Sequence, residues 1–371
     1  GPNPIYITDM LTPWDIVNIE YLCFHFLTFV CLFVCLFVCV FTAVCVAGYA
    51  PSHNEILELR LPLKLFADEN KGLCAERDFK VAHGGFTDGP VRCLKHVPGT
   101  RCVVTNDGRS SDLQLWDLGG DDSGTFHQES ERVESGSRIA ARLSSPPRVL
   151  HGARSSDVRL SELTSGRTLY TLEADSADPL TSLQFVSDSV FLAGCCNGSV
   201  YVADTRTPDA PQLSPPPASS ASSALWWTDA SEGLSTCRLV RLSSSGRAVM
   251  SDLRKLGGAV SQAQLEVQSR RCDLGDVTVS WAPALDDCVA VSGFSGVVQI
   301  FDTSLWRSEL QEARPLFVHR GHTVSSPPED GVPVLVTHHV WHPELPRTLL
   351  SAASDGSVHV WDWVNQSAAS S

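Results

Sequence analysis

The sequence lacks the short motifs with which many enzymes hold a phosphate or position a nucleophile. It contains no G-x-x-x-x-G-K-[ST] loop for phosphates and no G-x-S-x-G turn around a nucleophilic serine. Its 13 cysteines include no C-x-x-C pair and no Cys/His spacing that suits zinc. We therefore expect a protein that is not an enzyme and that has no metal or other cofactor.

Basic residues are also scarce. The chain of 371 residues carries 28 Lys and Arg against 42 Asp and Glu, which gives a formal net charge of −14. A surface that binds nucleic acid needs clustered Lys and Arg to neutralise phosphates. This charge balance disfavours direct nucleic-acid binding and fits a soluble protein whose partners are other proteins.

Charge of either sign is missing from one N-terminal stretch. No charged residue lies between Glu20 and Glu55, and residues 22–46 are almost wholly apolar, which is long enough for a transmembrane helix. The basic flank expected on the N-terminal side of a membrane anchor is missing, because the first Lys or Arg is Arg60. Within the stretch, residues 29–40 repeat the pattern Phe-Val-Cys-Leu almost perfectly.

Two hypotheses follow for residues 1–46, an atypical hydrophobic segment that we expect to be helical. A four-residue protein repeat is what a twelve-nucleotide DNA repeat encodes, so the first hypothesis is a translated intron or another gene-model artefact. The alternative is a genuine transmembrane helix, which would make the protein a membrane-tethered interaction platform. Transcript reads that retain the repeat in frame would contradict the artefact hypothesis.

The rest of the chain repeats one pattern of a polar turn, an alternating strand and a closing acidic residue. In the last copy Asp355-Gly356 forms the turn, Val358 and Val360 alternate with polar residues, and Trp361-Asp362 closes the strand. The closing residues are Asp117, Glu162, Asp204, Asp252, Asp302 and Asp362. Their intervals run from 42 residues (162 to 204) to 60 residues (302 to 362).

Blades of a β-propeller repeat about every 40–50 residues, and a Gly-His pair with a later Trp-Asp pair is typical of WD40 blades. Residues 54–59 resemble the end of one more blade, so we expect an all-β, seven-bladed WD40 propeller over residues 47–365. We expect residues 76–86 to open the second blade, the first blade to lack its early strands, and residues 366–371 to form a disordered tail.

In WD40 propellers a His, a Ser or Thr, a Trp and a turn Asp can join in a buried hydrogen-bonded network. By resemblance these positions in the last blade are His322, Ser351, Asp355 and Trp361. We interpret them as a structural tetrad that holds the blade together, and not as catalytic residues.

Other candidates have a structural and a functional interpretation. His338, His339 and His342 crowd around Trp341 and could bind a metal, but Trp-His-Pro also matches the first strand of a blade, which we favour.

Trp226-Trp227 could anchor a partner, although we favour a strand with one ring in the core and one half covered. Cys102, Cys195 and Cys288 lie in strand-like sequence and read as buried reduced thiols, which suits a reducing compartment.

Several runs of residues are similar to a vertebrate family of WD-repeat proteins, and the resemblance covers about residues 46–365. The runs are Glu76–Phe86, Val149–Arg154, Trp281–Pro283, His319–His322, Arg347–Ser351 and His359–Val364. The resemblance implies a non-enzymatic assembly factor for the RNA endonuclease module of the Integrator complex, with the Integrator endonuclease subunits as partners. It further implies a cytoplasmic location and a link to tubulin, the spindle pole and the cleavage furrow during division. No partner-binding residue can be carried over.

Overall fold

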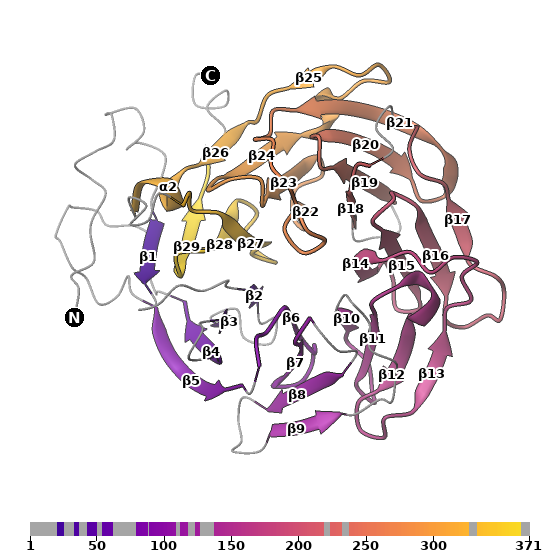
Figure 1. Ribbon diagram of the computed structural model, residues 1–371, viewed down its shortest axis with the longest axis vertical. Coiled ribbons are helices and arrows are strands. Elements are labelled where there is room, and N and C mark those ends of the chain that lie inside the picture. Colours follow the sequence, from indigo (N-terminus) through magenta and orange to yellow (C-terminus); the bar gives the residue numbers. More distant parts are fainter. Residues whose placement is uncertain are drawn as a thin grey trace. The chain divides into compact units, whose positions relative to one another are not determined.

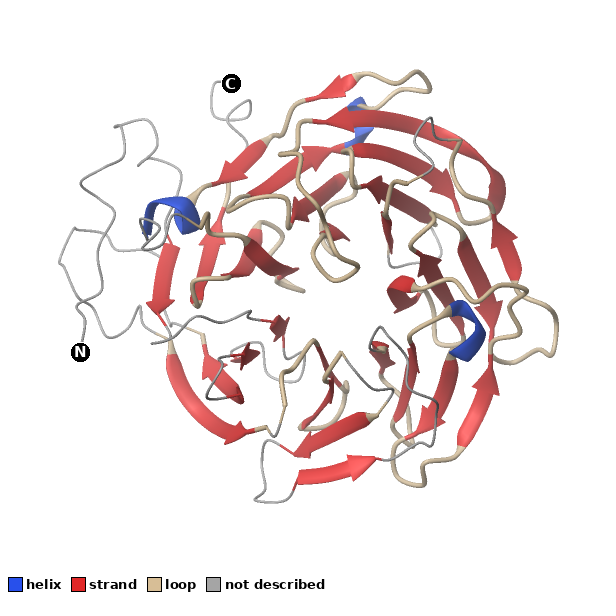
Figure 2. Ribbon diagram, in the orientation of Figure 1, coloured by secondary structure: helices blue, strands red, loops and turns tan. Residues whose placement is uncertain are grey.

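The computed structural model describes most of the chain after residue 79 and short parts before it. The described residues are 21–25, 33–36, 43–49, 54–61, 79–87, 89–108, 112–117, 123–126, 137–218, 223–231, 237–325 and 332–364. Strands dominate these ranges, as Figure 2 shows in red. Helical backbone within them is confined to α2 (Gly321–Ser325) and two 3-10 turns, Ser155–Asp157 and Thr303–Leu305.

The chain divides into two compact units. The first comprises Gly1–Asp88, Asp276–Thr303 and Pro315–Ser371, and the second comprises Gly89–Gly275 and Ser304–Arg314. Every sheet that the structure describes lies within one of these units.

The second unit is a series of antiparallel sheets that follow one another along the chain (Figure 1). The first two are β6 (Cys93–His96), β7 (Cys102–Asn106), β8 (Leu113–Asp117) and β9 (Ser123–Phe126), then β10 (Arg138–Arg142), β11 (Arg148–Gly152), β12 (Arg159–Glu162) and β13 (Thr168–Thr171).

The next two sheets are β14 (Leu180–Phe185), β15 (Val190–Cys195), β16 (Val200–Asp204) and β17 (Gln212–Ser214), then β18 (Trp226–Ala230), β19 (Arg238–Ser243), β20 (Arg247–Asp252) and β21 (Lys255–Leu265). A short strand, β25 (Glu312–Ala313), adds to β21 in parallel.

In the first unit, strands from both ends of the chain share a sheet. β27 (Val336–Trp341), β28 (Thr348–Ala353) and β29 (Ser357–Asp362) form a meander, and β1 (Tyr21–His25) pairs with β29. A second sheet contains β22 (Thr278–Trp281), β23 (Cys288–Ser292), β24 (Val298–Asp302) and β26 (Phe317–His319). A third contains β2 (Phe33–Leu36), β3 (Ala43–Tyr49), β4 (Asn54–Arg60) and β5 (Lys80–Phe86).

The repeat of closing acidic residues marks six blades. In the described part of the chain, β8, β12, β16, β20, β24 and β29 end at the six closing residues, and each is the third strand of its own blade. Six of the seven described sheets therefore carry the repeat. The predicted seven-bladed propeller is wrong: the repeat supports a six-bladed arrangement, and the seventh sheet, β2–β5, has no closing acidic residue at the end of β4. The seventh blade was inferred from residues 54–59, an alternating stretch without a closing acidic residue.

That stretch forms β4, which ends at Arg60 and lies between β3 and β5. The prediction that residues 76–86 open the next blade is wrong as well, because β5 (Lys80–Phe86) pairs with β4. Alternating apolar residues show that a segment is a strand, but they do not show which sheet it joins.

The N-terminal hydrophobic segment was predicted to be helical, and this part of the fold prediction is also wrong. Its described parts are the strands β1, β2 and β3, of which β2 pairs with β3, and β3 with β4, in antiparallel register. No helix among the described residues has the length and apolar character needed to cross a membrane. The domain boundaries at residues 46 and 365 stay a prediction, and residues 366–371 lie outside the described residues.

The core of each unit lies between neighbouring sheets. In the second unit, Leu150 and Leu160 pack with Phe191 and Tyr201 of the following sheet. In the first unit Ile300 packs in one cluster with Trp361. Because one face of each sheet packs on the next, the strands contain many buried Val, Leu and Ala residues.

Candidate functional site

The four predicted residues of the last blade lie around the short helix α2. His322 sits in its first turn and is completely buried. Its Nδ1 lies 2.7 Å from Ser357 Oγ and its Nε2 lies 2.8 Å from Ser351 Oγ. Trp361 Nε1 donates to the same Ser351 Oγ over 3.1 Å.

Asp355 joins this group through a serine that the sequence did not identify. Asp355 Oδ1 accepts hydrogen bonds from the backbone N (3.0 Å) and the Oγ (2.6 Å) of Ser357. The structure thus joins His322 and Trp361 through the Ser351 hydroxyl, and it joins Asp355 to His322 through Ser357. The signal for Ser357 was its place two residues after a turn Asp, a position where Ser199 makes the same bonds to Asn197.

The hydrogen bonds form a chain with one direction. The Trp361 N–H can only donate, and the Asp355 carboxylate can only accept. Ser357 therefore gives its proton to Asp355 and accepts one from His322 Nδ1–H, while Ser351 accepts from Trp361 and donates to His322 Nε2. This order fixes the neutral tautomer of His322 and leaves its two ring nitrogens fully used in joining α2, β28 and β29.

The same bond recurs in an earlier blade that also contains a Trp-Asp pair. Trp116 Nε1 on β8 donates to Thr105 Oγ1 on β7 over 2.9 Å. A hydroxyl on the second strand of the blade therefore accepts from a Trp on the third strand in both cases. This recurrence favours a role in holding strands together.

Two further buried histidines surround the network. His319 stacks on Trp361 with ring centroids 4.3 Å apart, and His359 stacks on His322 at 3.8 Å. His319 Nε2 lies 3.1 Å from His359 Nδ1. Burial holds the pKa of His319 well below its ordinary value, with a smaller contribution from His359. The sequence did not indicate either residue as part of this group, because neither belongs to the WD40 pattern.

The ligand atoms of His319, His322 and His359 lie within 4.8 Å of one another, close enough for all three to reach one metal ion. The orientation of the rings, however, does not fit a metal ion. The rings of His322 and His359 are parallel to within 3°, so their nitrogen lone pairs, which lie in the ring planes, do not converge. Both nitrogens of His322 also contact serine hydroxyls.

The other three histidines, which the sequence suggested as metal ligands, are His338, His339 and His342. Each of them has different hydrogen-bond partners. The buried His339 contacts Ser280 Oγ and Ser292 Oγ, each at 2.7 Å, and so links β27 to its neighbouring blade. His338 Nδ1 lies 3.1 Å from Thr278 Oγ1, and His342 Nδ1 accepts the backbone N–H of Leu345 over 3.0 Å.

The Trp226-Trp227 pair differs from the prediction. Both side chains are 2% exposed, so the expectation of one half-covered ring is wrong. Trp227 Nε1 donates to the carbonyl of Leu274 over 2.9 Å, and Trp226 packs against the turn at Gly198. Two buried rings stabilise the blade and offer no anchor to a partner.

Cys102, Cys195 and Cys288 are free thiols. Cys195 is buried, while Cys102 and Cys288 are partly buried. Burial raises the pKa of Cys195 and of Cys288 to about 11, which keeps both thiols protonated at neutral pH.

A blade repeat with buried His, Ser and Trp residues that join its strands defines a WD-repeat protein. No family model matches the chain. It is 46% identical over 335 residues to a protein from Danio rerio named Integrator complex assembly factor WDR73, which covers 87% of this chain and 88% of the relative. It is 39% identical over 340 residues to the protein of that name from Homo sapiens, covering 87% and 89%. The chain therefore belongs to the WDR73 family, which confirms the resemblance found in the sequence.

Proposed function

We propose that this chain is a non-enzymatic scaffold that assists the assembly of the Integrator complex, and specifically of its RNA endonuclease module. The observation that carries the proposal is the similarity over 87% of the chain to relatives named as Integrator complex assembly factors. The architecture supports a non-enzymatic role, because His322, Ser351, Asp355 and Trp361 form a buried hydrogen-bonded network that joins strands of the last blade. Such blades present loops and strand edges to protein partners.

The test is a pull-down with the tagged full chain from cells that express Integrator subunits. We expect the endonuclease subunits to be recovered with the chain. Depletion of the chain should lower the amount of the assembled endonuclease pair without lowering its messenger RNA. Recovery of no Integrator subunit, together with unchanged levels of the pair after depletion, would contradict the proposal.

The location and the microtubule link form a second part of the proposal. We expect the protein in the cytoplasm, and at spindle poles and the cleavage furrow in dividing cells, as the family resemblance implies. Fluorescence of the tagged chain through one cell cycle measures the location. Co-sedimentation with purified microtubules then separates direct binding to tubulin from an indirect association.

A further inference from the structure

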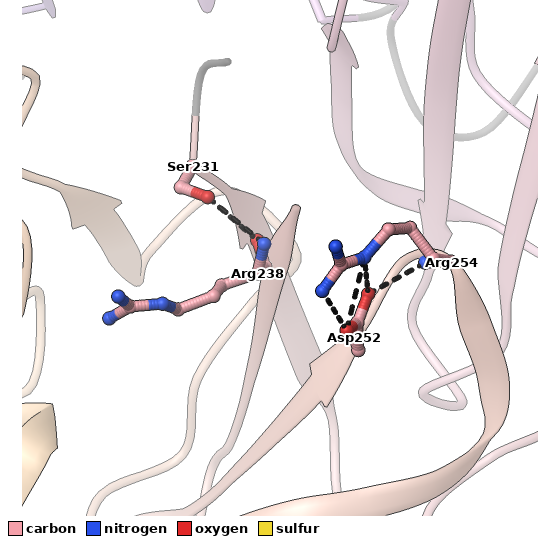
Figure 3. Close-up of polar contacts among 4 residues, drawn as sticks. All are labelled: Ser231, Arg238, Asp252 and Arg254. Atoms are coloured by element: carbon pink, nitrogen blue, oxygen red, sulfur yellow. Dashed lines mark hydrogen bonds and ion pairs between the residues drawn. The ribbon is translucent and has the colours of Figure 1, made fainter. Parts of the chain in front are cut away.

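Two exposed arginines of the second unit are neutralised by carboxylates beside them. Arg254 is 64% exposed, and its Nε and Nη2 donate to the carboxylate of Asp252, as Figure 3 shows. Arg206 is 71% exposed and is held by Asp204 in the same way. Both charges are balanced and reach solvent, so neither arginine requires a further ion.

Arg241, on β19 of the same unit, has a different environment. Its side chain is buried, and the whole residue is only 4% exposed. Its Nη1 donates to the carbonyl oxygens of Gly198 over 3.0 Å and Pro215 over 2.7 Å, and its Nη2 donates to Ser251 Oγ over 3.2 Å. Within the part of the chain that the structure describes, the hydrogen-bond partners of this guanidinium are therefore all neutral.

The Arg241 guanidinium keeps its charge despite this burial. Burial lowers the pKa of Arg241 to about 10, which leaves the group protonated at neutral pH. A buried charge is costly unless an opposite charge and hydrogen bonds compensate it. Two carbonyls and a hydroxyl supply hydrogen bonds, but none of them supplies a negative charge. The guanidinium is therefore a cation that a buried anion would stabilise.

The Nε–H of Arg241 and the hydroxyl of Thr228 are two donors on neighbouring strands. Among the described residues neither Arg241 Nε nor Thr228 Oγ1 has a hydrogen-bond partner, and both atoms are buried. Thr228 on β18 and Arg241 on β19 are direct register partners. Directly opposite residues share one face of the sheet, with Cβ atoms about 4.5–5.5 Å apart. The strand pairing thus places both donors on the same face of the blade.

The surroundings of these donors suit an ion of one atom. Gly194 on β15 approaches Thr228 so closely that a Cβ there would lie 2.9 Å from Thr228 Oγ1. The carbonyls of Gly198 and Pro215 bond Nη1, which lies on the opposite side of the guanidinium from the Nε–H. An ion at the Nε–H therefore avoids both carbonyl oxygens. A phosphate or carboxylate group would need more room and more donors.

We propose that Arg241 Nε and Thr228 Oγ1 together bind one halide ion, which is chloride under physiological conditions. A halide accepts hydrogen bonds from both donors and brings the negative charge that balances Arg241. A water molecule would accept the same two bonds but would leave the charge unbalanced, so the experiment has to separate these two occupants. The site lies between two blades of the second unit and is independent of the proposed scaffold function.

The first test is anomalous diffraction from crystals of the full chain grown in sodium bromide. We expect a bromide peak within hydrogen-bonding distance of both Arg241 Nε and Thr228 Oγ1. Thr228→Val keeps the shape of the side chain but removes the donor, so the peak should lose most of its height. Thr228→Ser keeps the hydroxyl and should retain the peak. A wild-type crystal with no bromide peak at this position, or a peak of unchanged height in Thr228→Val, overturns the proposal.

The second test measures melting temperatures while chloride replaces gluconate at constant ionic strength. An ion that binds only the folded chain raises the melting temperature by mass action, and we expect wild type to gain about 2–4 °C and then level off. Thr228→Val should show no such gain. The control Arg254→Ala removes an exposed charge far from solvent exclusion and should respond as wild type does. A response that is absent in wild type, or equal in wild type and Thr228→Val, overturns the halide site.

Discussion

Replacing Ser351 with alanine tests the hydrogen-bonded network of the last blade most directly. Ser351 Oγ is the shared partner of Trp361 Nε1 and His322 Nε2, and all three residues are completely buried. The substitution removes only one oxygen atom, so it opens almost no cavity. It leaves one donor and one acceptor buried without a partner.

Each such orphaned polar group costs about 1–3 kcal/mol, so we expect Ser351→Ala to lower the free energy of unfolding by about 2–6 kcal/mol. The exposed Ser165 provides a matched control, because its hydroxyl donates to the Glu162 carboxylate and accepts from the backbone N of Arg167 at the surface, and neither group is buried. Ser165→Ala should stay within about 0.5 kcal/mol of wild type. Urea unfolding of the full chain, followed by tryptophan fluorescence and circular dichroism, measures both variants.

A double-mutant cycle shows whether the loss comes from the network. Trp361→Phe removes the indole N–H, so the cost of Ser351→Ala should be smaller in that background by about 0.5–3 kcal/mol. Equal stability of Ser351→Ala and wild type would refute the network as an energetic unit. Strict additivity in the cycle would refute the shared acceptor.

Three further predictions concern other buried groups. Burial lowers the pKa of His339 to about 3 and of His151 to about 4, from an ordinary 6.5. Below pH 6.5 the unfolded chain takes up protons that the folded chain refuses. Stability should therefore fall by about 2 kcal/mol per histidine between pH 7 and pH 5, and a flat pH profile of unfolding would contradict this. Gly321→Ala should destabilise by about 1–3 kcal/mol in thermal melts, since its Cβ would lie 2.8 Å from two buried histidine rings; Gly257→Ala, with open space around it, should be neutral. Arg241→Ala should destabilise by about 2–4 kcal/mol in urea unfolding, because three oxygens that accept from this buried guanidinium lose their donor.

The residues of the last blade could be selected from the sequence because their pattern is local and fixed. Asp355-Gly356 marks a tight turn, and the structure gives Gly356 a φ of +83°, the left-handed conformation that glycine adopts readily. The sequence did not identify His319 or His359, whose rings stack on Trp361 and His322. These stacks join residues 42 positions (His319 and Trp361) and 37 positions (His322 and His359) apart, and no periodicity encodes such a contact.

The repeat of closing acidic residues determined, by itself, where six third strands end, because turn chemistry and alternation act within a few neighbouring residues. The sequence could not determine the partners of those strands. Only the tertiary structure showed that Tyr21–His25 pairs with β29, that residues 54–60 lie inside an N-terminal sheet, and that the hydrophobic segment contributes strands. A long apolar run satisfies a buried helix and a buried strand equally well, and backbone hydrogen bonds to distant strands decide between them.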